Sequence, residues 1–273
     1  MKVMGLGDNV IDRYQHTGLG YPGGNALNFS VFAHELNADT AYLGIFGDDA
    51  AAAHIRQILA NRQIQTRHCL DVPGESGFAT LTIQNGDRVF LGSNAGGVRQ
   101  RTPMDFILQH QPWLSEFSLI HSAAYSYTEH LLPQLARLPG LLSYDFSDDF
   151  TPDNALACCQ WLDYAFFSCS ERSLSETREL LAEAHHKGGA ITVATRGEEG
   201  ALLFDGETWL FQHPTPITAV DTLGAGDGFI TAFLLAHLSG KNLVTSLQAG
   251  ADFAAQVCTT DGAFGEPIQL ALL

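Results

Sequence analysis

The chain has 273 residues, of which 45% are hydrophobic, and its 14 basic residues against 30 acidic ones give a formal net charge of −16. This length and apolar content suit one large α/β domain. A surface this negative disfavours nucleic acid and anionic lipid as partners, so an anionic ligand would have to be held by backbone amides and a metal ion.

The N-terminal stretch and the cysteines indicate where the chain resides. MKVMGLGDNVID reaches acidic and polar residues too early for a secretory signal, and no run approaches the roughly 20 apolar residues of a membrane span. The five cysteines are odd in number and form no C-x-x-C pair, which is typical of reduced thiols. We therefore expect a cytoplasmic protein with no membrane partner.

Short apolar, β-branched runs recur along the chain and predict strands. In order they are MKVMGLG, AYLGIFG, SLIHSAA, GLLSYDF, YAFFSC, AITVAT and ALLFD. Segments with helical periodicity lie between many of them; Phe29 and Phe32 share one face of the first, and Ile55 and Ile58 share one face of the next. This alternation predicts a mostly parallel sheet covered on both faces, in a single domain over residues 1–273.

Two stretches interrupt the alternation and look like antiparallel strands, at about 13–22 and 77–98. The second contains Asn85-Gly86, a strong signal for a hairpin turn. A hairpin attached to an open α/β sheet suits a lid over a site. An ordinary edge hairpin explains the pattern equally well.

Residues 219–240, AVDTLGAGDGFITAFLLAHLSG, place glycines and acids directly before an apolar helix. Gly224, Gly226 and Gly228 would let backbone N–H groups converge where the helix dipole adds roughly half a positive charge. We expect Asp227 beside these amides to stay ionised and to accept a proton. The arrangement suits phosphoryl transfer to a hydroxyl. A capped helix whose glycines ease close packing is an equally good interpretation.

Three motifs carry a resemblance to a known family. DTLGAGDGF (221–229) resembles the C-terminal signature D-T-x-G-A-G-D-x-F of the PfkB, or ribokinase, family of sugar kinases. GGNALN (23–28) resembles its N-terminal signature, and TRGEEGALL (195–203) resembles its nucleotide-side turn. The resemblance implies a ribokinase-like three-layer α/β sandwich with a small β lid, ATP as phosphoryl donor, Mg²⁺, and transfer to a primary hydroxyl.

The resemblance also implies roles for individual residues around the transferred phosphate. Asp227 matches the catalytic base, and the amides of the preceding residues match the anion hole, at Gly224, Ala225 and Gly226. Asp12 matches a carboxylate that hydrogen-bonds sugar hydroxyls. The other sugar-side positions of the family match Gly23, Gly24, Asn25 and Asn28.

The nucleotide and metal positions depart from the family at one residue. The nucleotide-side turn matches Thr195, Gly197 and Gly200. The family's N-x-x-E motif, whose glutamate helps to hold Mg²⁺ through water, becomes SCSE, with Ser168 in place of the asparagine and Glu171 retained. Because a carboxylate with waters suits this ion, we expect Mg²⁺ binding to persist. Asp221 falls where some members bind a monovalent cation such as K⁺, mainly through backbone oxygens.

The stretches GDNVIDRY, PGGNALN, DRVF and YDFSDD most resemble the fructoselysine kinases of this family. A fructosamine with an amino-acid moiety carries an amine and a carboxylate. We expect Asp8 and Asp12 to favour the amine, and Arg88 on the lid to meet the carboxylate. A solvated hairpin residue is the alternative for Arg88. A kinase for a simple hexose or for 2-keto-3-deoxygluconate is the alternative function.

Two further interpretations concern a dinucleotide motif and the loss of catalysis. GLGYPG (18–23) fits the dinucleotide pattern G-x-G-x-x-G, but about ten residues separate it from the first strand, and Pro22 suits that loop badly, so we reject it. A non-catalytic sugar- or nucleotide-binding kinase homologue would have lost its base, whereas Asp227 is present; Ser168 keeps this alternative open. By resemblance, a homodimer formed through the lid is a hypothesis.

Overall fold

The computed structural model describes residues 1–84 and 87–273, and its strands form two sheets. The larger sheet has the order β13-β12-β11-β10-β9-β8-β1-β4-β5 and the smaller one has the order β14-β3-β2-β6-β7. The strands of the larger sheet are β1 (Lys2–Gly7), β4 (Asp39–Phe46), β5 (Leu70–Asp71), β8 (Leu119–Ala123), β9 (Leu141–Asp145), β10 (Tyr164–Ser168), β11 (Ile191–Thr195), β12 (Ala201–Phe204) and β13 (Trp209–Gln212). Those of the smaller sheet are β2 (Val10–Tyr14), β3 (Leu19–Gly23), β6 (Gly77–Gln84), β7 (Asp87–Ser93) and β14 (Ile268–Gln269).

The larger sheet is parallel from β5 to β11, and β12 and β13 are added antiparallel at one edge. The seven predicted strands correspond to β1, β4, β8, β9, β10, β11 and β12. The expected mostly parallel sheet is therefore confirmed. The sequence analysis missed β5, which has two residues, and β13, an edge strand with little buried surface to mark it.

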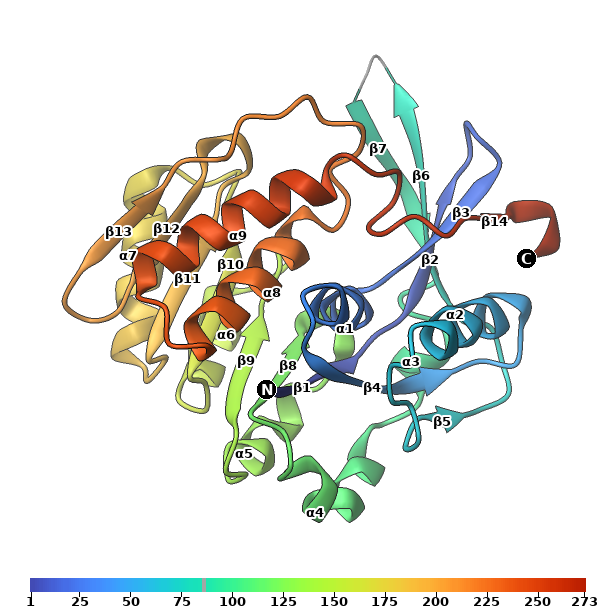
Figure 1. The fold of residues 1–273 in the computed structure, drawn as a ribbon, viewed down its shortest axis with the longest axis horizontal. Coiled ribbons are helices and arrows are strands. Elements are labelled where there is room, and N and C mark those ends of the chain that lie inside the picture. Colours follow the sequence, from blue (N-terminus) through green and yellow to red (C-terminus); the bar gives the residue numbers. More distant parts are fainter. Residues whose placement is uncertain (85–86) are drawn as a thin grey trace.

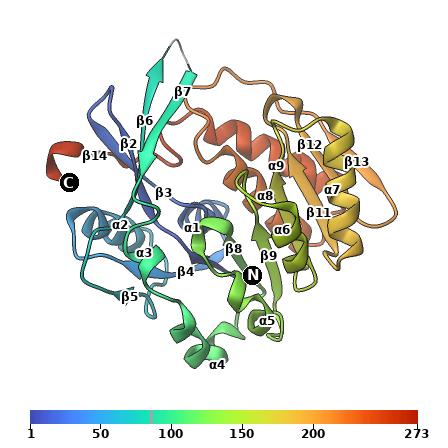
Figure 2. The same ribbon diagram turned by 180° about the vertical axis from the view of Figure 1, so that it is seen from behind.

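Helices cover both faces of this sheet (Figures 1 and 2). They are α1 (Asn25–Glu35), α2 (Ala50–Asn61), α3 (Val98–Arg101), α4 (Gln111–Leu114), α5 (Leu132–Leu135), α6 (Pro152–Cys159), α7 (Leu174–His186), α8 (Ala225–Leu238) and α9 (Leu243–Val257). Short 3₁₀ helices lie at Asp105–His110, Ala124–Ser126, Glu129–Leu131, Gly197–Glu199 and Leu270–Leu272.

Successive side chains of a strand point to opposite faces of the sheet, so alternate residues pack into the hydrophobic cores on its two faces. In β4, Leu43 packs with the α3–α7 side, whereas Tyr42 and Phe46 pack with α1, α2, α8 and α9. A third buried cluster joins Phe29 of α1 and Phe233 of α8 to the middle of the sheet. The fold is the expected three-layer α/β sandwich.

The smaller sheet lies beyond one end of the larger one and combines segments from both ends of the chain (Figure 1). As expected, β2 pairs antiparallel with β3, and β6 with β7, but β2 and β6 are parallel, with Val10 opposite Gly77. The C-terminal β14 completes the sheet on β3 and was not predicted, because two residues carry no period. The predicted turn at Asn85-Gly86 lies outside the described residues.

Candidate active site

The start of α8 differs from the other long helices on the same side. Asp49 caps α2 by accepting from the Ala52 amide, and Asn242 caps α9 by accepting from that of Thr245. Among the described residues no side chain caps α8, which begins after Gly224 in the left-handed conformation (φ 76°). The amides of a first helical turn have no intrahelical acceptor, so this end is open to an anion.

The three glycines of this turn meet three different surroundings. A Cβ at Gly224 would lie 2.7 Å from Cβ of Ala263, and one at Gly228 would lie 2.8 Å from Cγ2 of Val257 on α9. At Gly226, a Cβ would have no heavy atom of the described residues within 4 Å. Gly224 and Gly228 therefore serve the turn and the packing of α8 on α9, whereas Gly226 borders open space.

That space is a pocket of about 770 Å³ between the edge of the larger sheet and helices α8 and α9. Its lining includes the residues expected on the nucleotide side, namely Ser168, Thr195, Gly197 and Gly200, together with Ala225 and Gly226 of the expected anion hole. An apolar wall completes it, formed by Pro214, Pro216, Ile217, Phe229, Ala251, Ala254 and Ala255. Its size and mostly apolar walls, with open amides at one end, fit a nucleoside triphosphate.

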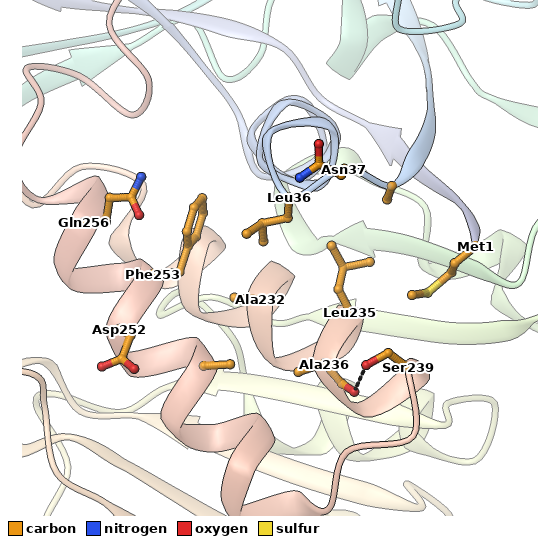
Figure 3. Close-up of a pocket in the computed structure, with 12 residues that line it drawn as sticks. Met1, Leu36, Asn37, Ala232, Leu235, Ala236, Ser239, Asp252, Phe253 and Gln256 are labelled. Carbon is orange, nitrogen blue, oxygen red and sulfur yellow. Dashed lines mark hydrogen bonds between the residues drawn. The ribbon is translucent and has the colours of Figure 1, made fainter.

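A second pocket of about 580 Å³ lies elsewhere, between the C-terminal end of α1 and helices α8 and α9 (Figure 3). Leu36, Leu235 and Phe253 line it, and Met1 lies at one side. None of the residues expected in the active site contributes to this lining in the described part of the chain.

The two family signatures meet at Asp227, which is 8% exposed. Its Oδ1 accepts a hydrogen bond from Nδ2 of Asn25 at 2.9 Å, and its Oδ2 accepts one from Nδ2 of Asn28 at 2.7 Å. Asn25 and Asn28 lie in the first turn of α1, so the first turns of α1 and α8 face each other across this carboxylate. Two donors thus hold both oxygens in place.

Asp145 is a site residue that the sequence analysis missed. It is buried at the end of β9, and its Oδ2 accepts from the same Asn25 Nδ2 at 3.2 Å. The ends of parallel strands converge at one edge of a sheet. The acid near the end of the apolar run GLLSYDF could therefore have been recognised as a candidate site residue.

Asp227 and Asp145 hold their protons more tightly than ordinary carboxyls. The pKa of Asp227 is raised to about 8, chiefly by burial and also by the nearby charges of Asp145 and Asp8, while the hydrogen bonds from Asn28 and Asn25 oppose the rise. Burial likewise raises the pKa of Asp145 to about 7. In the ligand-free chain, burial among carboxylates outweighs the two asparagine donors, so it opposes the ionised form of Asp227 that the helix amides are expected to favour.

The carboxylate of Asp8 already accepts hydrogen bonds from other groups of the protein. Its Oδ2 accepts from the Asn25 amide at 2.9 Å, and its Oδ1 accepts from the Ala26 amide at 3.1 Å and from Oγ of Ser126 at 2.8 Å. A Cβ at Gly24 (φ 110°) would lie 2.8 Å from Oδ2 of Asp8, so glycine is needed for this approach. Asp8 acts as the cap of α1.

The other expected sugar-side residues lie along β2 and β3. Asp12 is 7% exposed, and a Cβ at Gly23 would lie 2.2 Å from its Oδ2, so Gly23 leaves room for the carboxylate. Arg88 belongs to β7, but its side chain lies outside the described residues. Asp12 is thus placed on the smaller sheet, on the same strand as Tyr14.

The expected cation residues differ in accessibility. Glu171 is exposed in the turn after β10, close in sequence to Ser168 and Ser170 of the pocket. Among the described residues no group of three acidic, histidine or cysteine side chains could hold a metal ion. A single exposed carboxylate fits Mg²⁺ that arrives with phosphates and keeps its waters. Asp221, by contrast, accepts from the Leu223 and Gly262 amides at 3.0 and 2.9 Å.

The comparisons decide the family. Residues 5–268 match the family described as pfkB family carbohydrate kinase. The chain is 40% identical to "Fructosamine kinase FrlD" of Bacillus subtilis over 97% of this chain and 93% of that protein. This chain belongs to the PfkB family of carbohydrate kinases. The predicted class of enzyme, an ATP-dependent carbohydrate kinase, is thereby confirmed.

This PfkB-family kinase is also similar to a second relative by sequence and to a solved structure by fold. It is 30% identical to "Fructoselysine 6-kinase" of Escherichia coli over 95% of this chain and 98% of that protein. It superposes with a TM-score of 0.80, at 19% identity, on Arabidopsis thaliana ribokinase complexed with ribose and ATP, covering 97% of this chain and 94% of the other. The predicted ribokinase-like fold is therefore confirmed. Within the described residues of the kinase, no helix is long and apolar enough to span a membrane.

Proposed function

We propose that this kinase transfers the γ-phosphoryl group of ATP to a primary hydroxyl of a fructosamine such as fructoselysine. The observation that carries the proposal is the meeting of Asn25, Asn28 and Asp227 at the uncapped start of α8, beside the 770 Å³ pocket. This arrangement supplies a base and an anion site next to a space of nucleotide size. The 40% identity to a fructosamine kinase supports the substrate class.

The proposed chemistry uses groups of this chain. The ionised Asp227 accepts the proton of the sugar hydroxyl while that oxygen bonds to the γ-phosphorus, and the bond from this phosphorus to the bridging oxygen breaks to release ADP. The amides from Gly224 to Asp227 stabilise the charge on the moving group. Asn25 and Asn28 keep the base aimed at the hydroxyl. When bound, Mg²⁺ would neutralise phosphate charge, with Glu171 holding it through water.

A cationic amine is the feature by which the site would distinguish its sugar. Asp145 and Asp12 are buried carboxylates; Asp145 accepts a hydrogen bond from Asn25, and Asp12 lies against Gly23, two residues before Asn25 in the chain. We assign the amine of the fructosamine to this acidic region, with Asp145 in place of Asp8, because Asp8 already receives three donors. Such a region disfavours the carboxylate of 2-keto-3-deoxygluconate, and free fructose has no cation to offer.

The smaller sheet is proposed as the lid over the sugar, since it carries Asp12 and Gly23. Contact of Arg88 with a substrate carboxylate and pairing of lids in a homodimer remain predictions. A monovalent cation near Asp221 would need main-chain oxygens, because the side chain already accepts hydrogen bonds from two amides.

A screen of ADP release tests this function. Fructoselysine, a second fructosamine, fructose and 2-keto-3-deoxygluconate would be compared with MgATP, and we expect the highest kcat/KM for a fructosamine. Asp227→Asn should lower kcat on the order of a hundredfold or more, with ATP binding retained. Preference for free fructose would overturn the substrate, and unchanged turnover in the variant would overturn the role of Asp227. An inert wild type that still binds would favour the non-catalytic alternative.

A further inference from the structure

Tyr14 joins the smaller sheet to the segment that leads into α8. It lies on β2, is 5% exposed, and its hydroxyl donates to Oδ2 of Asp221 at 2.5 Å. Asp221 stands three residues before Gly224, and its carboxylate also accepts from the amides of Leu223 and Gly262. One carboxylate thus ties a strand of the smaller sheet to both loops that frame the anion site.

Packing reinforces this connection. Tyr14, Tyr21 and Leu81, from β2, β3 and β6, form a buried cluster against which Leu223 packs. The rings of Tyr14 and Tyr21 meet edge to face with centroids 5.0 Å apart. A Cβ at Gly262 (φ 66°) would lie 2.6 Å from Cβ of Tyr21, so the loop and the sheet are in close contact.

The same strand carries the sugar-side carboxylate. Asp12 and Tyr14 are two residues apart on β2, so their side chains leave the same face of the sheet. The pairings of Asp12 with Tyr21 on β3 and of Tyr14 with Leu81 on β6 keep this face in register. A displacement of β2 on sugar binding at Asp12 would therefore be transmitted to Tyr14 and through it to Asp221.

We propose that Tyr14 is a positioning residue that couples sugar binding at the smaller sheet to nucleotide binding at the start of α8. The sugar holds β2 through Asp12, the Tyr14 hydroxyl then holds Asp221, and Asp221 fixes the loop whose Gly224 begins the anion site. By linkage, sugar and nucleotide each tighten the binding of the other by the same factor. This inference rests on the proposed function, because it takes Asp12 and the α8 amides as binding groups.

The test measures that coupling factor. The Kd of a non-hydrolysable ATP analogue with Mg²⁺ would be determined by calorimetry with and without the sugar that the wild type phosphorylates best. We expect the sugar to tighten the analogue at least about fivefold in the wild type. Tyr14→Phe, which keeps the ring and removes only the hydroxyl, should bring the factor below about twofold and lower kcat, while the Kd of sugar alone changes little.

Two controls separate positioning from general stability. Tyr21→Phe removes a hydroxyl from the same cluster and should retain the wild-type coupling factor and melting temperature. In an Asp221→Ala background, Tyr14→Phe should have no further effect on coupling, because its acceptor is already gone. Wild-type turnover without any coupling, equal coupling in Tyr14→Phe, or equal losses in both tyrosine variants would each overturn this inference and leave the proposed function standing. If no sugar is phosphorylated, the proposed function fails and this inference fails with it.

Discussion

At the residue scale, the proposed chemistry depends on how tightly Asp227 holds its proton. Two asparagine amides hold its oxygens at 2.9 and 2.7 Å, yet burial beside Asp145 and Asp8 raises its pKa to about 8. The signature motif indicates that an acid stands at this position. Its proton affinity depends on neighbours from three other segments of the chain.

The first consequence is a pH dependence of the reaction. Because Asp227 accepts a proton only when ionised and its pKa is about 8 in the ligand-free protein, kcat/KM should rise with pH from neutrality and level off above that pKa. Asp145→Asn removes a negative charge that favours the protonated acid, so the rise should move to lower pH. Initial rates from pH 6 to 10 with the same sugar measure this difference.

Because Asp145 is also the proposed partner of the sugar's amine, the comparison is repeated with free fructose, which has no amine to titrate. Identical pH profiles for the wild type and Asp145→Asn would contradict an electrostatic link between the two acids. A profile that is already level from pH 6 upward would contradict the raised pKa of Asp227.

At the element scale, α8 meets conflicting demands at its first turn. The proposed anion site needs open amides and space at Gly226, whereas packing needs close contact with α9 at Gly228. The apolar remainder of α8 provides this close packing, since its buried residues extend as far as Leu235. The packing interpretation is therefore supported at Gly224 and Gly228, and the open space at Gly226 leaves room for the proposed anion site.

Two alanine substitutions separate these demands. Gly226→Ala meets open space, so it should keep or raise stability by up to about 1 kcal/mol through helix propensity, while its methyl obstructs the phosphate and lowers kcat/KM on the order of a hundredfold. Gly228→Ala should instead lower stability by about 1–3 kcal/mol, because its Cβ would overlap Val257. Urea unfolding and initial rates report the two effects, and full activity in Gly226→Ala would rule out a phosphate at that position.

At the scale of the whole molecule, we expect the two sheets and the net charge of −16 to govern how substrates reach the proposed site. The smaller sheet combines β2 and β3 from the N-terminus, the β6–β7 pair, and the C-terminal β14. Strands far apart in sequence therefore build the sheet that we propose as the lid. The overall charge should repel the anionic nucleotide and attract the proposed cationic sugar.

Salt should therefore act in opposite directions on the two substrates. Between about 10 and about 150 mM of a bulky monovalent salt such as tetramethylammonium chloride, screening should raise kcat/KM for MgATP and lower it for a fructosamine, each by a fewfold. Initial rates with one substrate saturating and the other limiting measure each change. A parallel fall for both substrates would show that long-range charge does not govern their approach.

What the sequence determined by itself is local: the strand and helix periods, the glycine turn before α8, and the short signatures that contain Asp227 and Asn28. These follow from neighbouring residues, whose order along the chain already defines the period and the turn. Tertiary structure alone decided which distant groups meet: that Asn25 bridges Asp145 and Asp227, that Asp8 caps α1, that β14 joins the smaller sheet, and that Tyr14 reaches Asp221. Burial and proximity between segments as much as 250 residues apart, as for Gln269 opposite Leu19, set these contacts and the pKa values that follow from them, and a one-dimensional pattern contains neither.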